Sequence, residues 1–374
     1  MPSDVVSLLQ TLIRIPSVNP DCSPDGDGEA AMANYVQAYL ENVGFDVRQE
    51  VVQPNRPNLI ARCPGSNERP RILLGPHLDT VSVAGMDMDT FGQITDDGRV
   101  LGRGASDTKG PMAAMLQALS NCRGLLEQLP VAVDFIGFMG EEASQHGSQH
   151  FAKHHAQEYE FALAGEPTSL DIVHVTKGSL WATLNASGKA AHASQPELGE
   201  NAILKLAHAL GVLDKKLVAQ LAEYTHPILG HTTLNVGVFH GGKQPNIVPD
   251  FASAQIDIRM TPSLTEDCGA LALVEKVIAE ESLPISVSQP HENPPMEVPV
   301  DHPWILKMQA ANPDSQAVGA PWFSDAAHLN AAGLPSICVG PGSIDQAHTR
   351  DEFIQISDLE AGVEYFERLI RSLA

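Results

Sequence analysis

The pattern of apolar and polar positions predicts a helix followed by a strand near the start of the chain. Residues 29–43 have apolar side chains at helical spacing and end at Gly44, a residue typical of helix C-caps. Residues 45–51 then largely alternate between apolar and polar, as in a half-buried strand. We therefore expect an α/β fold from the N-terminal region onward.

Four later apolar runs are expected to form buried strands. They cover residues 72–74, 131–138, 161–164 and 336–339. Potential metal ligands follow every one of these runs, namely His77 and Asp79, Glu141 and Glu142, Glu166, and His348. Open α/β sheets bind ligands beyond the carboxyl ends of their strands, so we expect these side chains to converge.

The central part of the chain has a different pattern. It predicts a strand, a helix, two strands, a helix and a strand over residues 180–187, 200–213, 234–239, 251–260, 264–281 and 285–288. This order is that of the split β-α-β-β-α-β unit. A chain of 374 residues also exceeds the size of most single domains. We therefore expect a metal-binding catalytic domain of residues 1–177 and 290–374, with an inserted domain of residues 178–289.

The chain is expected to return to the catalytic domain through the proline-rich residues 291–303. Ser357 and Glu360 have the spacing of a capping box, which predicts that they start the last helix.

Composition limits the partners and the cellular location. Acidic residues outnumber basic ones 46 to 23, and a formal charge of -23 argues against binding to nucleic acid or to an anionic membrane surface. No apolar run approaches the length of a membrane span. The five cysteines are odd in number and contain no C-x-x-C pair. The N-terminus lacks the basic region of a signal peptide, so we expect a cytoplasmic protein.

A histidine and an aspartate follow the first buried strand. If the strand continues, His77 and Asp79 lie on one face, and the carboxylate can orient the imidazole. The alternative for so short a pattern is a capped turn after the strand.

Asp107 lies between glycines in residues 102–110, at a turn that precedes the helix-like residues 111–119. A carboxylate in this position can bridge two cations. The alternative is that Asp107 only caps the helix that follows.

Glu141 and Glu142 are adjacent carboxylates directly after a buried strand. Their mutual repulsion is relieved if one of them binds a metal and the other acts as a general base. The alternative is an acidic loop that faces solvent. With Glu166 and His348, the set contains two histidines and several carboxylates, which suits zinc, cobalt or manganese better than calcium.

Together these motifs resemble the metallopeptidase family that contains acetylornithine deacetylase, succinyl-diaminopimelate desuccinylase, carboxypeptidase G and aminoacylase. The resemblance covers nearly the whole chain and is carried by residues 15–20, 77–80, 102–110, 140–142, 166–167 and 340–348. It implies an α/β, mixed-sheet zinc-peptidase-like catalytic domain. The inserted domain is implied to be an α+β ferredoxin-like lid and dimerisation domain.

The resemblance also implies how two zinc ions are held. His77, Asp107 and Glu166 would hold one ion, and Asp107, Glu142 and His348 would hold the other. Co²⁺ or Mn²⁺ would be substitutes for Zn²⁺.

The same resemblance assigns the catalytic carboxylates. Glu141 is implied as the general base toward a metal-bridging water, and Asp79 as the residue that orients His77.

The inserted segment resembles the family's lid through residues 188–194. His192 is implied to stabilise the oxyanion, and in dimeric relatives it reaches the partner's active site, so we expect a homodimer formed through the lid. Asn246 and Arg259 resemble segments that recognise the substrate carboxylate, with Ser324 and Gly342 as further candidates. The alternatives are a surface histidine in a turn and a surface arginine on a strand.

The expected reaction is hydrolysis of the amide bond of a small N-acyl amino acid or dipeptide. Residues 340–348 and 351–353 look closer to acetylornithine deacetylase than to the desuccinylase. N-acetyl-L-ornithine or a similar N-acyl amino acid is therefore the preferred substrate, which implies a role in amino-acid biosynthesis. The alternatives are a dipeptidase, carboxypeptidase or desuccinylase on the same centre, and a catalytically inactive homologue that binds a metal or ligand.

Overall fold

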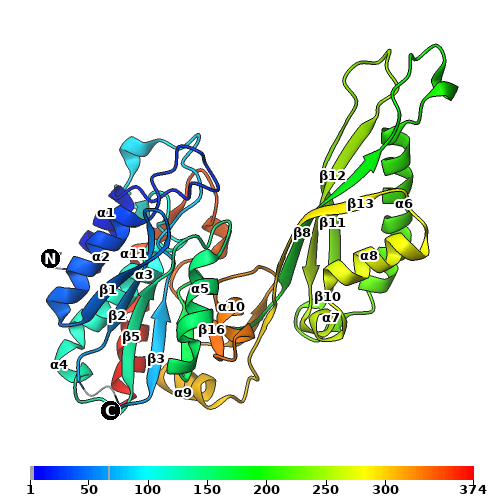
Figure 1. The fold of residues 1–374 in the computed structure, drawn as a ribbon. Coiled ribbons are helices and arrows are strands. Elements are labelled where there is room, and N and C mark those ends of the chain that lie inside the picture. Colours follow the sequence, from blue (N-terminus) through cyan, green and yellow to red (C-terminus); the bar gives the residue numbers. More distant parts are fainter. Residues whose placement is uncertain (1–3, 66–67) are drawn as a thin grey trace. The chain divides into compact units, whose positions relative to one another are not determined.

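The chain forms two structural units in a computed structural model that describes residues 4–65 and 68–374 (Figure 1). The first unit contains the described residues of Met1–His174, Val298–Val318 and Ser324–Ala374. The second contains Val175–Glu297 and Gly319–Phe323. The chain therefore passes between the units near residues 174, 297, 318 and 323.

A nine-stranded mixed sheet contains the buried strands of the first unit. Its order is β1-β2-β5-β3-β6-β16-β7-β14, with β15 also paired to β7. Strands β5, β3, β6 and β16 run parallel to their neighbours in this series. The strands are β1 (Asp46–Gln53), β2 (Arg56–Arg62), β3 (Arg71–Gly75), β5 (Ala132–Gly137), β6 (Phe161–Ala164), β7 (Ile172–Thr176), β14 (Met296–Glu297), β15 (Ala317–Ala320) and β16 (Ser336–Cys338).

The central strands are apolar on both faces because the sheet lies between two layers of helices. In β3, Ile72 and Leu74 belong to one core cluster, whereas Leu73 belongs to another. The larger cluster includes residues of α1 (Val5–Arg14), α2 (Ala30–Val43), α3 (Lys109–Asn121), α9 (Pro303–Ala311) and α11 (Ile356–Arg371). The smaller cluster includes residues of α5 (His146–His155) and α10 (Ala326–Ala331). The predicted α/β fold class is confirmed.

Short elements complete the first unit. Strands β4 (Arg99–Leu101) and β17 (Phe353–Gln355) form an antiparallel pair, in which Leu101 lies opposite Phe353. The remaining helices are η1 (Met88–Thr90), α4 (Arg123–Leu126), η2 (Ala156–Glu158) and η4 (Ile344–Gln346). The β4–β17 pair places Glu352, which precedes β17, beside the segment that carries Asp107, because the Gly102 amide donates to the Glu352 carbonyl at 3.0 Å.

The second unit is a four-stranded antiparallel sheet with helices over one face. The order β11-β12-β8-β13 is that of a split β-α-β-β-α-β unit. Its elements are β8 (Gly178–Ser187), η3 (Pro196–Leu198), α6 (Ala202–Leu221), β9 (Thr225–His226), β10 (Gly230–His231), β11 (Thr233–Gly241), β12 (Phe251–Met260), α7 (Pro262–Asp267), α8 (Ala270–Glu280) and β13 (Ser286–Asn293). Alternate residues of β8 and β12 join α6 and α8 in one core.

Two local predictions were wrong. The helix expected over residues 264–281 is two helices, α7 and α8, because Gly269 has a φ of 80° and interrupts the helical backbone. The carboxylate of Glu292 then accepts a hydrogen bond from the Ala270 amide at 2.9 Å, which caps α8. The last helix begins at Ile356 after Gln355, so Ser357 lies inside the first turn and is not its N-cap.

Among the described residues, no helix is both long and apolar enough to cross a bilayer.

Candidate metal centre

Five side chains form two overlapping groups of potential metal ligands in the first unit. One group is His77, Asp107 and Glu166, and the other is Asp107, Glu142 and His348. Within each group the ligand atoms lie within 4.8 Å of one another. Asp107 belongs to both groups, so a single carboxylate links them.

Four of these side chains follow adjacent parallel strands. His77 follows β3, Glu142 follows β5, Glu166 follows β6, and His348 lies beyond β16. The pairing of β3 with β5 continues past Gly75, because the Leu78 amide donates to the Phe138 carbonyl at 2.7 Å. A Cβ at position 75 would lie 2.7 Å from the Phe138 ring, so glycine permits this approach. The polar residues that follow these apolar strands therefore meet at one edge of the sheet.

Asp107 reaches this edge from the turn before α3. Its Oδ1 lies 3.1 Å from Nε2 of His77, and its Oδ2 lies 3.3 Å from Nε2 of His348. Thr108, not Asp107, is the N-cap residue of α3, and it makes no side-chain capping bond. The carboxylate is therefore directed at the two histidines and does not cap the helix.

Glu352 holds the Asp107 turn in place and was missed by the sequence analysis. Its Oε1 accepts hydrogen bonds from the amides of Ser106 at 2.9 Å and Asp107 at 3.0 Å. Its Oε2 accepts from the Gly104 amide at 3.1 Å and from Nη1 of Arg103 at 2.7 Å. The only sequence signal was an acidic residue in 351–353, where no local pattern identifies a partner 245 positions away.

Asp79 orients two parts of the centre. Nδ1 of His77 lies 3.0 Å from the Asp79 carbonyl oxygen and 3.4 Å from its Oδ1. The Asp79 carboxylate accepts hydrogen bonds from the amides of Glu141 and Glu142, both at 3.1 Å, and from Nδ2 of Asn19 at 2.7 Å. Asp79 therefore supports the His77 ring and fixes the backbone that carries the two glutamates.

The protein's own groups leave an excess of buried negative charge at this site. Burial, with the Asp107 carboxylate next, raises the pKa of Glu142 to about 7. Burial also raises the pKa of Glu166 well above its usual value, and nearby Asp107 adds to this effect. Hydrogen bonds to Asp107 and Glu142 raise the pKa of His348 to about 10. Burial therefore disfavours the charged form of these carboxylates, and bound cations would stabilise it.

Glu141 lies outside both ligand groups. Burial raises its pKa well above the usual value, and the next largest cause is repulsion from Glu166. Its carboxyl group also interacts electrostatically with His77. Glu141 is thus a partly buried residue close to the centre that, among the described residues, is not grouped with the candidate ligands.

Three of the predicted site residues belong to the second unit. Nδ1 of His192 lies 2.8 Å from Oγ of Ser194, and the next amide, of Ala193, donates to the Asn246 carbonyl at 3.1 Å. The His192 and Asn246 segments therefore pack together. Nε and Nη2 of Arg259 each donate to the Asp257 carboxylate at 2.9 Å, so this guanidinium already has a bidentate carboxylate partner.

The remaining two candidates lie in the first unit. Oγ of Ser324 is buried 2.9 Å from Sγ of Cys338, and it accepts a hydrogen bond from the Ala326 amide. Gly342 has a φ of 87°, and a Cβ there would lie 2.5 Å from Oγ of Ser106. Gly342 therefore allows its loop to approach the Asp107 turn closely.

Comparison with known proteins agrees with this architecture. Residues 73–372 match the peptidase family M20/M25/M40. The chain is 29% identical to an acetylornithine deacetylase of Proteus mirabilis, over 98% of this chain and 96% of the relative.

Solved structures show the same fold. An M20 family metallo-carboxypeptidase from Sulfolobus solfataricus superposes with a TM-score of 0.80 at 19% identity, covering 100% of this chain and 99% of the other. A Bacillus subtilis protein described as a dinuclear metal binding peptidase of the M20 family superposes with a TM-score of 0.67 at 14% identity, covering 98% and 96%. The fold and the resemblance predicted from the motifs are confirmed.

Proposed function

This chain belongs to the peptidase family M20/M25/M40, and we propose that it is a dizinc hydrolase that removes the acyl group from N-acyl amino acids, with N-acetyl-L-ornithine as the preferred substrate. The observation that carries the proposal is the pair of ligand groups that share Asp107. Glu141, which is partly buried beside them, adds a general base that metal binding alone does not require.

The donor set fits two zinc ions. His77, Asp107 and Glu166 would hold one, and Asp107, Glu142 and His348 would hold the other. Cobalt or manganese would substitute, since the same nitrogen and oxygen donors bind them. When bound, the two ions would polarise the amide carbonyl and lower the pKa of water.

The protein's own groups handle the proton. In our proposal the Glu141 carboxylate takes a proton from the attacking water and returns it to the departing nitrogen. The burial that raises the pKa of Glu141 supports this role, because a carboxyl group with a raised pKa is a better proton carrier near neutral pH. Asp79 would keep His77 and the Glu141 backbone in place through the bonds described above.

Substrate recognition is assigned to Asn246, Arg259, Ser324 and Gly342. Arg259 would bind the substrate carboxylate. Because Asp257 occupies its Nε and Nη2, the substrate would either use Nη1 or replace Asp257. The affinity for the substrate carboxylate should therefore rise in Asp257→Asn. An unchanged affinity would contradict the proposal that Arg259 binds this carboxylate.

We also propose that the protein is a homodimer formed through the second unit, with His192 stabilising the oxyanion in the partner's site. Strand β11 is at the end of the sheet order and pairs with β12 alone among the described strands. Val236 and Phe239 on β11 and Leu204 on α6 are exposed by 41%, 41% and 67%. An open strand edge beside exposed apolar side chains favours association with a second copy.

The proposed location is the cytoplasm. All five cysteines are free thiols, as is usual in a reducing compartment.

The decisive experiment is turnover by the zinc-loaded protein on a panel of N-acyl amino acids and dipeptides. N-acetyl-L-ornithine should give the highest kcat/KM, whereas a preference for N-succinyl-diaminopimelate or for dipeptides would support the desuccinylase or the peptidase. Glu141→Gln should retain the metals and lose turnover by about a thousandfold or more. Glu160→Gln, a change at an exposed glutamate, is the matched control. No turnover on any substrate would indicate the non-catalytic homologue.

A further inference from the structure

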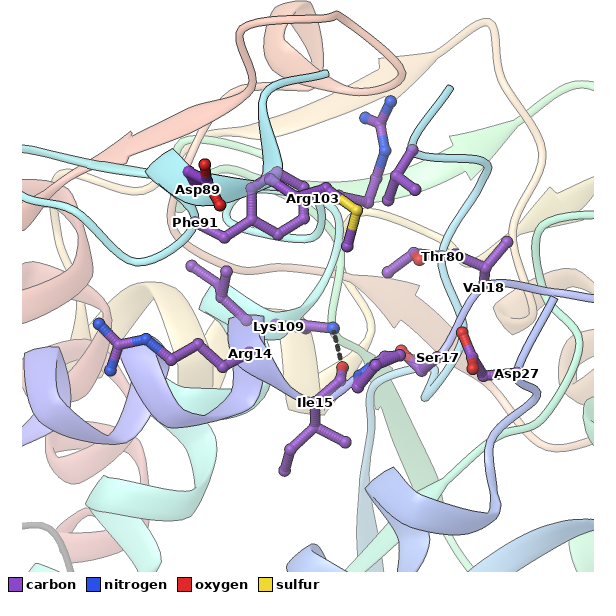
Figure 2. Close-up of a pocket in the computed structure, with 14 residues that line it drawn as sticks. Arg14, Ile15, Ser17, Val18, Asp27, Thr80, Asp89, Phe91, Arg103 and Lys109 are labelled. Carbon is purple, nitrogen blue, oxygen red and sulfur yellow. Dashed lines mark hydrogen bonds between the residues drawn. The ribbon is translucent and has the colours of Figure 1, made fainter. Parts of the chain in front are cut away.

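A cavity of about 360 Å³ lies in the first unit beside the Asp107 turn (Figure 2). Its walls are the end of α1, residues 15–18, the loop of residues 80–91, and the side chains of Arg103 and Lys109. Its lining, as far as the structure describes the chain, includes none of the five candidate metal ligands. The cavity is therefore a feature separate from the metal centre.

Lys109 places a buried amino group in the wall of this cavity. The residue is 3% exposed, and its Nζ donates one hydrogen bond, to the Ile15 carbonyl at 2.9 Å (Figure 2). An ammonium group carries three N–H donors, so donors remain for a ligand. Within residues 4–65 and 68–374, no carboxylate lies within 4.0 Å of this Nζ.

The nearest interacting carboxylate does not neutralise Lys109 by direct contact. Glu352 interacts with Lys109 electrostatically, but its two oxygens already accept four hydrogen bonds from the Asp107 turn and Arg103. Arg103 is also engaged, because its Nε and Nη2 donate to the Ser82 carbonyl at 3.2 and 3.1 Å. Lys109 is therefore the buried basic group of this cavity that, among the described residues, lacks a carboxylate partner in direct contact.

Ser17 adds a second unused polar group to the same wall. It is 1% exposed, and its Oγ has no hydrogen-bond partner among the described residues. A buried hydroxyl without a partner is uncommon and unfavourable, so it indicates a group that a ligand can satisfy.

The rest of the lining is mainly apolar. It includes the side chains of Ile13, Val18, Val83, Met88 and Phe91. Arg14, Asp27 and Asp89 also line the cavity, but all three are exposed and therefore hydrated. The cavity thus combines the buried amino group of Lys109 and the buried hydroxyl of Ser17 with largely hydrocarbon walls, in the size range of small-molecule sites.

We infer that this cavity binds a small apolar monocarboxylate, whose carboxylate accepts hydrogen bonds from Lys109 and Ser17 and whose hydrocarbon part packs against Phe91 and Met88. A carboxylate supplies the opposite charge that Lys109 lacks and accepts from the Ser17 hydroxyl. An alcohol would satisfy the hydrogen bonds but not the charge, and an ammonium ligand would be repelled by Lys109.

The test is binding of hexanoate, 1-hexanol and hexylammonium to the full-length, zinc-loaded chain. The readout is the ¹³C-methyl resonance of Met88, which lines the cavity and is assigned by its loss in Met88→Leu. Hexanoate should shift this resonance saturably, with a Kd at least about tenfold lower than that of hexanol. The inference is overturned if hexanoate leaves the resonance unmoved, or if hexanol or hexylammonium binds as tightly. This readout does not depend on turnover, so its result does not depend on whether the proposed reaction takes place.

Two variants test the named groups. Lys109→Met should weaken hexanoate binding by about tenfold or more, whereas Lys153→Met, a change at an exposed lysine, should leave it unaltered. Ser17→Ala should weaken binding by about threefold or more and should fold normally, because its hydroxyl makes no hydrogen bond among the described residues. If Lys109→Met fails to fold, Ser17→Ala decides. Wild-type affinity in the folded variants would overturn the assignment.

Discussion

Glu352→Gln is the sharpest test of how the Asp107 turn is held. The substitution keeps the size of the side chain but replaces one carboxylate oxygen with an NH₂ group. Both oxygens now accept two hydrogen bonds each, from Ser106 and Asp107 on one side and from Gly104 and Arg103 on the other. In either orientation the new NH₂ group therefore faces two donors, and Arg103 loses its ion pair.

The expected cost follows from these contacts. Glu352 is 1% exposed and Arg103 is 5% exposed, so solvent cannot replace the lost bonds. Two hydrogen bonds to a charged acceptor contribute about 1.5–3 kcal/mol each, and breaking a buried ion pair from one side costs about 3–5 kcal/mol. These two figures describe the same lost contacts and are not added together. We therefore expect the free energy of unfolding of the first unit to fall by about 3–5 kcal/mol.

Urea unfolding followed by Trp304 fluorescence measures this change in the first unit alone. Trp304 belongs to the first unit, whereas Trp181 and Trp322 belong to the second and would be changed to Phe in the background. Zinc affinity is measured in parallel and should fall about 10–100-fold, as is typical when a residue that supports a ligand is lost.

The control is Glu364→Gln on α11. Its carboxylate is 71% exposed and pairs with Arg368 one helical turn away, so the expected loss is below about 0.5 kcal/mol. If Glu352→Gln costs less than about 1 kcal/mol and leaves zinc affinity unchanged, the reasoning about this turn is refuted.

Three further predictions address other parts of the chain. Asp107→Ala should lose both metals, because this carboxylate belongs to both ligand groups; two tightly bound ions by elemental analysis would contradict the bridging role. Asn19→Ala removes a 2.7 Å hydrogen bond to Asp79 and should lower zinc affinity by about tenfold or more, whereas unchanged affinity would show that Asp79 needs no such support. Gly269→Ala should destabilise the second unit by about 1–3 kcal/mol, because a φ of 80° with a ψ of 160° is a backbone region nearly restricted to glycine; an unchanged urea midpoint of Trp181 fluorescence, in a Trp304→Phe background, would disprove this.

Strand positions were the part of the fold that the sequence predicted best. The run of residues 131–138 became β5 at Ala132–Gly137, and residues 161–164 became β6 at Phe161–Ala164. Strands with helices on both faces must be apolar at successive positions, so the pattern alone identifies them. Strand β2, Arg56–Arg62, was not predicted, because arginine at both ends and Asn58 within it interrupt the apolar run.

Helix limits in the second unit were less predictable. Helix α6 begins after Asn201, whose side chain accepts a hydrogen bond from the Leu204 amide, and continues to Leu221, well past the expected end at residue 213. The apolar stripe persists through Leu217 and Leu221, but Lys215 and Lys216, which directly precede Leu217, weaken the local pattern. Packing against the sheet, which the local pattern does not contain, keeps this stretch helical.

The sequence by itself determined the types of side chain at the strand ends, and with them the prediction of a centre built from histidines and carboxylates. It did so because apolar runs and the polar residues that follow them are local features of the chain. The family resemblance already implied that Asp107 is shared by His77 and His348, and the tertiary structure supplied the contacts that place it there. Only the tertiary structure decided that Glu352 and Asn19 support the centre. These contacts join residues that are far apart in the chain, and their partners are chosen by sheet order and loop packing, for which no local pattern exists.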